Sequence, residues 1–168
     1  MNSLRLFVIR KLMYFIPETR CFGFKRALYR WAGANIGEGV KICSSVKISG
    51  IGNLTILDNT WISSATIIGC SFRVTIGENC DIGPSVYIGD GTHEITPSRE
   101  RMAGLDTTRE IFIGNGCWLC VNSTILPGVT IGQKCVVAAG AVVTSSCADL
   151  KLLAGVPAKV IKEYTITE

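Results

Sequence analysis

Residues 113–132 read IGNGCWLCVNSTILPGVTIG, with an aliphatic residue at every sixth position: Ile113, Leu119, Ile125 and Ile131. An uncharged residue stands four positions after each of them. A six-residue period fits neither an amphipathic helix nor a long strand. It indicates a coil of short straight segments separated by corners, with the aliphatic side chains pointing inward.

The same period extends over most of the 168-residue chain. Further positions that keep it, all Ile or Val, are Ile36, Ile42, Ile48, Ile56, Ile62, Ile68, Ile76, Ile82, Ile88, Val137 and Val143. Three segments form one triangular rung of about 18 residues, and stacked rungs lie about 4.8 Å apart. We therefore predict an all-β fold, a parallel β-helix of about five triangular rungs over residues 34–168.

The repeat also shows where the coil is interrupted. No repeat position falls between Ile88 and Ile113, so residues 94–112 are expected to leave the coil at one corner as an extruded loop. A long loop inside a compact repeat is usually functional. Residues 149–168, which follow the last repeat, are expected to form a C-terminal tail.

The first 33 residues differ from the rest in charge and pattern. They hold seven Lys and Arg against one Glu, a net charge of +6, whereas the remainder has ten bases and twelve acids. Two helical stripes of apolar residues are expected to face the coil: Leu4, Val8, Leu12, Phe15 and Ile16, then Phe24, Leu28 and Trp31. Residues 1–33 are interpreted as a short helical cap over the open end of the coil, with a basic membrane-binding surface as the alternative. The slightly acidic main body gives no sign of nucleic-acid binding.

Eight cysteines raise the question of disulfides or metal. The apolar run 6–9 is too short for a secretory signal, and no stretch is long enough to span a bilayer. We therefore expect a cytoplasmic protein, free or in peripheral contact with the inner face of the membrane, whose thiols are reduced. The single C-x-x-C, Cys117 and Cys120, has no second pair and no nearby histidine, so we predict no metal and interpret the cysteines as packing residues.

Three stretches resemble the hexapeptide-repeat acyltransferases, specifically the sugar O-acetyltransferases of the maltose and galactoside type and those of polysaccharide biosynthesis. They are IGNGCW (113–118), STILPGVTIG (123–132) and AGVPAKVIK (154–162). The resemblance implies a left-handed coil, acetyl-CoA as co-substrate, and a homotrimer with active sites between neighbouring coils. It further implies that Trp118, Ala139 and Gly140 line the groove for the pantetheine arm, while Lys159 and Lys162 meet the phosphates of CoA.

His93 is the only histidine and stands in GTHEI (91–95), where similar acetyltransferases place a catalytic histidine before a loop. An imidazole can accept the proton of a sugar hydroxyl as it attacks a thioester, so His93 is predicted to be the general base. Asp81 is favoured as its orienting group across a subunit boundary, with a solvated carboxylate as the alternative. Glu94 and Arg101 are expected to contact the acceptor.

These observations favour an acetyl-CoA-dependent O-acetyltransferase acting on a saccharide during capsule, O-antigen or exopolysaccharide assembly. The acceptor is expected to be a sugar, either free or linked to a lipid or nucleotide. The alternative is an N-acetyltransferase acting on a nucleotide-linked amino sugar, which could use the same scaffold and histidine. A γ-carbonic-anhydrase-like enzyme would need three zinc-binding histidines, and a purely structural coil would not need the interruption beside His93.

Overall fold

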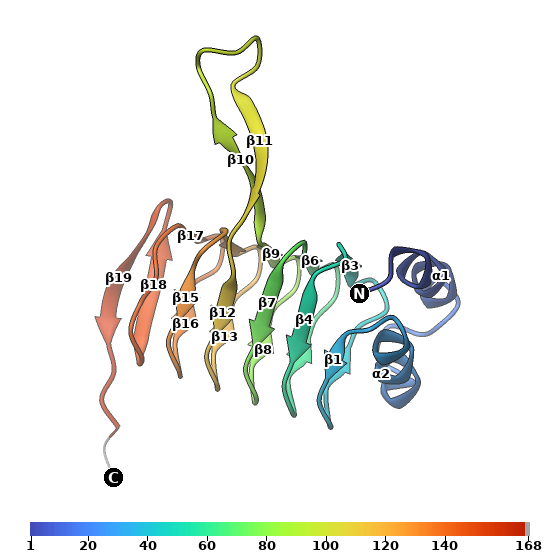
Figure 1. The fold of residues 1–168 in the computed structure, drawn as a ribbon. Coiled ribbons are helices and arrows are strands. Elements are labelled where there is room, and N and C mark those ends of the chain that lie inside the picture. Colours follow the sequence, from blue (N-terminus) through green and yellow to red (C-terminus); the bar gives the residue numbers. More distant parts are fainter. Residues whose placement is uncertain (167–168) are drawn as a thin grey trace.

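The computed structural model describes residues 1–166, which form two short helices followed by a coil of parallel strands (Figure 1). The helices are α1 (Ser3–Met13) and α2 (Phe22–Trp31). The first face of the coil holds β1 (Asn35–Ile36), β4 (Asn53–Ile56), β7 (Arg73–Ile76), β12 (Ile111–Ile113) and β15 (Thr130–Ile131). The second holds β2 (Lys41–Ile42), β5 (Trp61–Ile62), β8 (Asp81–Ile82), β13 (Trp118–Leu119), β16 (Val136–Val137), β18 (Lys151–Gly155) and β19 (Ala158–Glu163). The third holds β3 (Lys47–Ser49), β6 (Ile67–Gly69), β9 (Tyr87–Gly89), β14 (Thr124–Ile125) and β17 (Val142–Val143).

Strands of successive turns pair in register, so identical side chains stack along the interior. On the first face, Ile56 is paired with Ile36 on one side and with Ile76 on the other. Every repeat position recognised in the sequence is buried. Each turn thus covers the apolar residues of its neighbours, and the predicted parallel β-helix is confirmed.

The coil has about six turns, whereas the sequence predicted about five. The additional turn is partial: β18 pairs with β16, which places Leu153 next to Val137, and Cys147 bridges to Ile131. The repeat does not reveal this turn because the position six residues after Val143 is Asp149. Residues 149–168 were expected as a tail, of which 167–168 lie outside the described residues; instead, β18 continues the second face and β19 folds back on it as an antiparallel strand.

One column of corner residues sets the geometry of each turn. Gly39, Asn59, Asn79, Gly116 and Lys134 occupy equivalent corners, all with a left-handed backbone and φ between 51° and 69°. Glycine and asparagine tolerate this conformation best, which explains why they occupy four of these five positions. The backbone N–H of Asn59 donates to the carbonyl of Glu38 on the preceding turn at 2.8 Å, and Asn79, Gly116 and Lys134 repeat this contact.

The two helices cover the N-terminal end of the coil, but not with the predicted stripes. In α1 the buried residues are Leu6, Ile9 and Met13, whereas Leu4, Val8 and Leu12 of the predicted stripe are exposed. In α2 the buried residues are Lys25 and Tyr29; of the predicted stripe, Leu28 packs partly buried against the core, whereas Phe24 and Trp31 are exposed. The stripe in α1 was wrong because this helix is apolar on two opposite sides, and the pattern alone does not say which side packs.

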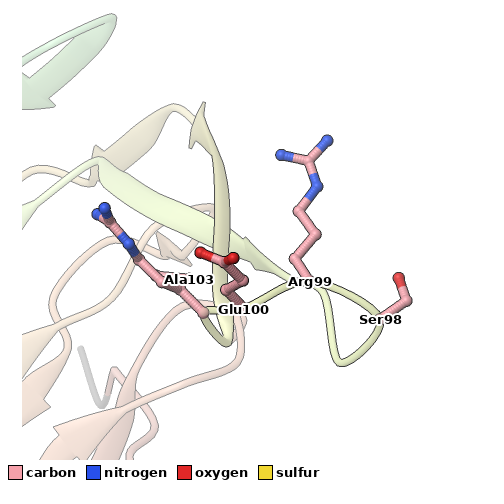
Figure 2. A pocket seen from close by; sticks show the side chains of 5 residues that line it. Ser98, Arg99, Glu100 and Ala103 are labelled. Carbon is pink, nitrogen blue, oxygen red and sulfur yellow. The ribbon is translucent and has the colours of Figure 1, made fainter.

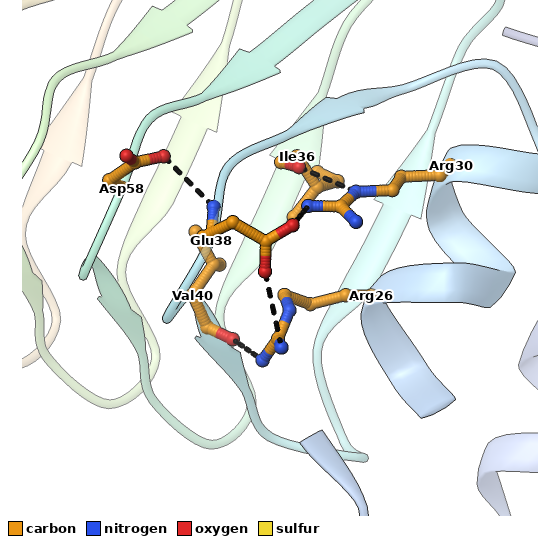
Figure 3. A network of polar contacts seen from close by, with 6 residues as sticks. All are labelled: Arg26, Arg30, Ile36, Glu38, Val40 and Asp58. Carbon is orange, nitrogen blue, oxygen red and sulfur yellow. Dashed lines mark hydrogen bonds and ion pairs between the residues drawn. The ribbon is translucent and has the colours of Figure 1, made fainter. Parts of the chain in front are cut away.

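Ionic and hydrogen-bonded contacts fasten α2 to the first turn (Figure 3). The carboxylate of Glu38 lies 2.9 Å from Arg30 and 3.6 Å from Arg26. Both arginines also donate to the backbone of this turn: Arg30 to the carbonyl of Ile36 and Arg26 to that of Val40. The Arg30 hydrogen bond is the main reason that the pKa of Glu38 is lowered from its ordinary value.

The interruption of the coil is an antiparallel hairpin that projects from one corner (Figure 1), made of β10 (Gly91–Ile95) and β11 (Ala103–Thr108). The excursion therefore begins and ends a few residues earlier than the expected 94–112. Ile111 and Phe112 already belong to the coil, where they pair with Val74 and Thr75.

The cysteines are free thiols, and five of the eight are buried in the coil. Burial is the main reason that the pKa values of Cys70 and Cys147 rise to about 11. These thiols are therefore protonated at neutral pH and fill space as small apolar groups. No helix within residues 1–166 has both the length and the apolar character needed to cross a bilayer.

Candidate active site

His93 and Asp106 form a cross-strand pair in the hairpin. They are register partners on β10 and β11, which brings their side chains to the same face of the antiparallel pair. The Nδ1 atom of His93 lies 3.0 Å from Oδ1 of Asp106. A carboxylate at Nδ1 favours the tautomer that carries its proton there, which leaves the Nε2 lone pair free to accept a proton.

This pair borders a hollow of about 390 Å³ at the base of the hairpin. The lining residues are Ser71, Gly91, Thr92, His93, Asp106, Thr107 and Thr108. Hydroxyl groups on several of these residues can donate and accept hydrogen bonds, which suits a polyhydroxylated ligand. The side chain of His93 is about half exposed, so it can meet a ligand here without a change of fold.

A buried carboxylate fixes one wall of the hollow. Asp90 is fully buried and accepts hydrogen bonds from the backbone N–H groups of Ser71 and Phe72, at 2.7 and 2.8 Å. These bonds tie the start of the hairpin to the corner of the preceding turn. Asp90 therefore positions the backbone around the hollow, and it is Asp106 that contacts the imidazole.

Asp81, the residue favoured in sequence to orient His93, lies elsewhere. It belongs to β8 on the second face, where Trp118 is its partner on the next turn, as the repeat predicted. The two residues lie on different parts of the fold within residues 1–166, so their contact across a subunit boundary stays a prediction. Sequence reasoning missed Asp106 because its place opposite His93 depends on the register of a hairpin that has no repeat.

The two residues expected to bind the acceptor are also apart from the hollow. Glu94 follows His93 in β10 but is not among the residues that line the hollow. Arg101 lies at the tip of the hairpin, where Ser98, Arg99, Glu100, Arg101 and Ala103 surround an open hollow of about 550 Å³ (Figure 2). Two guanidinium groups at this tip could bind an anionic group.

The residues expected to bind CoA lie towards the C-terminal end of the coil. Trp118 is 54% exposed on β13, which pairs with β16. Ala139 and Gly140 form an exposed corner directly after β16, where Gly140 has φ 69° and open space around its Cα. Lys159 and Lys162 are exposed on β19 of the same sheet. Within one chain, then, the expected donor residues share one sheet, and His93 lies on the hairpin outside it.

Within the described range 1–166, no three His, Cys, Asp or Glu side chains are grouped so that they could hold a metal ion. The hollow beside His93 is lined by an imidazole, a carboxylate and hydroxyl groups. This set of groups suits proton transfer to and from a hydroxyl substrate.

Comparison with known proteins gives consistent matches. A family model described as "Bacterial transferase hexapeptide (six repeats)" matches residues 110–145. The chain is 33% identical over 150 residues to the Escherichia coli protein named "Putative colanic acid biosynthesis acetyltransferase WcaF", covering 85% of this chain and 80% of that protein. It is 32% identical over 139 residues to the galactoside O-acetyltransferase of Escherichia coli, covering 83% of this chain and 68% of that protein. A solved structure of a galactoside acetyltransferase in complex with coenzyme A superposes with a TM-score of 0.69 at 27% identity, covering 95% of this chain and 80% of the other.

Proposed function

Since this chain belongs to the hexapeptide-repeat acetyltransferase family, we propose that it transfers the acetyl group of acetyl-CoA to a hydroxyl group of a saccharide in polysaccharide biosynthesis. The relatives that support this proposal are named for colanic acid biosynthesis and for O-acetylation of galactosides. The observation that carries it is the exposed His93–Asp106 pair beside a hollow lined by hydroxyl groups.

In this reaction His93 is the general base. Its Nε2 atom takes the proton of the acceptor hydroxyl as the oxygen attacks the carbonyl carbon of the thioester. The carbon–oxygen bond forms, the carbon–sulfur bond breaks, and the proton passes from the imidazolium to the departing thiolate to give free CoA. Asp106 keeps the imidazole in the required tautomer and stabilises its charged form while it holds the proton.

Acetyl-CoA is proposed to bind along the second face of the coil. Trp118 and the corner at Ala139 and Gly140 would contact the pantetheine arm, and Lys159 and Lys162 would attract the phosphates as exposed point charges. These residues and His93 lie on different parts of one chain. We therefore propose a homotrimer in which the hairpin of one subunit meets the donor groove of its neighbour, in the cytoplasm where acetyl-CoA is available.

The remaining sequence-based roles are revised or kept as predictions. Asp106 replaces Asp81 as the proposed orienting residue, since it already occupies Nδ1 of His93. Acceptor contacts by Glu94 and Arg101 stay predictions. They would matter most for an acceptor that carries a phosphate or carboxylate, which Arg101 could bind.

Purified protein incubated with acetyl-labelled acetyl-CoA and a panel of sugars, oligosaccharides and nucleotide-linked sugars tests the proposal. We expect label on at least one saccharide, and we expect mild alkali to release it, because an acetyl ester is labile to base whereas an amide is stable. Base-stable label found only on amino sugars would establish the N-acetyltransferase alternative. Absence of both CoA binding and transfer would contradict the enzymatic assignment.

A further inference from the structure

Helix α1 has a second apolar side that the fold does not cover. Its inward side chains Leu6, Ile9 and Met13 pack on the coil. On the opposite side Leu4 is 70% exposed and Phe7 52%, and Phe15, just past the helix, is 82% exposed. A helix that is apolar all round is normally covered on every side. We call Leu4, Phe7, Val8, Lys11 and Phe15 the outer face of α1.

The charges on α1 itself have one sign. Residues 1–17 contain no Asp or Glu, and Lys11 sits within the outer face with its ammonium group 5.6 Å from the ring centre of Phe7. The first acidic residue along the chain, Glu18, lies beside this surface and accepts hydrogen bonds from the backbone N–H and hydroxyl of Ser45. An apolar, aromatic surface with an excess of positive charge matches the interface of an anionic bilayer.

Two adjacent hollows extend this surface towards the first turn. One, of about 370 Å³, is lined by Arg10, Lys11, Tyr14 and Phe15. The other, of about 360 Å³, shares Arg10 and Tyr14, reaches Lys47 on β3 and also contains Glu18 in its lining. Cationic side chains around these hollows can pair with phosphate oxygens, and the neighbouring aromatic rings can contact acyl chains.

We propose that the outer face of α1 docks on an anionic lipid bilayer. Phe7 and Phe15 enter the boundary between headgroups and acyl chains, and Arg10, Lys11 and Lys47 meet lipid phosphates. Figure 1 places α1 at the end of the coil opposite β19, so a flat surface can approach it from outside. Pairing with the same face of a second copy is disfavoured, because it would bring Arg10 and Lys11 against identical charges.

This proposal does not depend on the acetyl-transfer reaction, and vesicle flotation of the full chain tests it. We expect the protein to float with vesicles of phosphatidylcholine and phosphatidylglycerol, to float poorly with phosphatidylcholine alone, and to be released by salt. The double variant Phe7→Ser, Phe15→Ser should partition at least about tenfold more weakly, since two buried aromatic groups are lost. Lys11→Glu should weaken binding by about tenfold.

Matched substitutions at remote sites serve as controls. Ile161→Ser removes an exposed apolar group of β19, 62% exposed, and Lys134→Glu makes the same change of charge at an exposed corner of the coil. Both should bind vesicles like the unmodified protein, and all variants should keep the same circular dichroism spectrum. Equal flotation of the Phe7→Ser, Phe15→Ser variant and the unmodified protein would overturn the proposal. So would a smaller particle mass for this variant in solution, because that result would assign the outer face to contact between copies.

Discussion

The imidazole of His93 is held by a carboxylate of its own hairpin: Nδ1 lies 3.0 Å from Oδ1 of Asp106, thirteen residues further along the chain. The pair lies within one chain and depends on the register of β10 and β11. In the proposed mechanism, a partner chain supplies the donor groove and the hairpin itself orients the base.

Asp106→Asn should lower kcat by about 10- to 100-fold and leave the KM for acetyl-CoA unchanged. The reason is that an amide can present its NH₂ group to Nδ1 and so favour the tautomer with the proton on Nε2. Steady-state kinetics with a fixed saccharide acceptor would measure both constants.

Two other carboxylates provide the comparison. Glu100→Gln, at the tip of the same hairpin, should leave kcat unchanged, and Asp81→Asn should lower it much less than Asp106→Asn does. If instead Asp81→Asn proved the more damaging change, the orienting role would pass from Asp106 to a residue of the adjacent subunit.

Reversing the charge of the β19 lysines should weaken the binding of CoA phosphates. Lys159→Glu and Lys162→Glu should each raise the KM for acetyl-CoA by about fivefold, a modest effect because both side chains are exposed. The effect should shrink at high salt. Acetyl-pantetheine, which lacks the phosphates, is the control donor, and its KM should not respond to either substitution.

The inward and outward positions of one strand should differ strongly in their effect on stability. Ile68 is fully buried, whereas its neighbour Ile67 on β6 is 37% exposed. Ile68→Ala should lower the free energy of unfolding by about 2–5 kcal/mol, and Ile67→Ala by less than about 1 kcal/mol. Chemical denaturation of the two variants would measure the difference, and equal losses would contradict the assigned register.

The link between Glu38 and α2 should make stability depend on pH. The pKa of Glu38 is lowered mainly by the hydrogen bond from Arg30, so the native state favours the ionised form. This contribution is present above the ordinary pKa of glutamate and is lost as the pH falls through the lowered value. Glu38→Gln should therefore be less stable than the unmodified protein at neutral pH, and the difference should disappear in acid. Thermal unfolding of both proteins across this pH range would measure the difference in stability. A difference that stays the same at every pH would contradict the prediction, because it would show that the charge of Glu38 plays no part.

The six-residue repeat predicted most of the fold and the region of the chain that holds the candidate site. Ile, Leu or Val at every sixth position predicted the inward-facing residues, and the break after Ile88 predicted an excursion that begins beside His93. These features can be predicted from the sequence because each turn packs only against its neighbours. Every turn therefore needs the same kind of apolar side chain at the same position.

What the sequence did not reveal depends on segments without a repeat. Asp106 meets His93 only through the register of a hairpin, and the partial sixth turn begins where Asp149 breaks the period. In α1, Leu6 faces the coil rather than Leu4 because packing selects one of two apolar sides. In each case the sequence pattern allows more than one local arrangement, and a contact between distant parts of the chain selects one of them.

The central claim is that His93 removes the proton of the acceptor hydroxyl, and the acetyl-transfer rate of His93→Ala tests it most directly. With an accepted saccharide, this folded variant should still bind acetyl-CoA, while its kcat should fall by about 10²- to 10⁴-fold. Turnover close to that of the unmodified protein would contradict the account, since no other histidine in the chain could take its place.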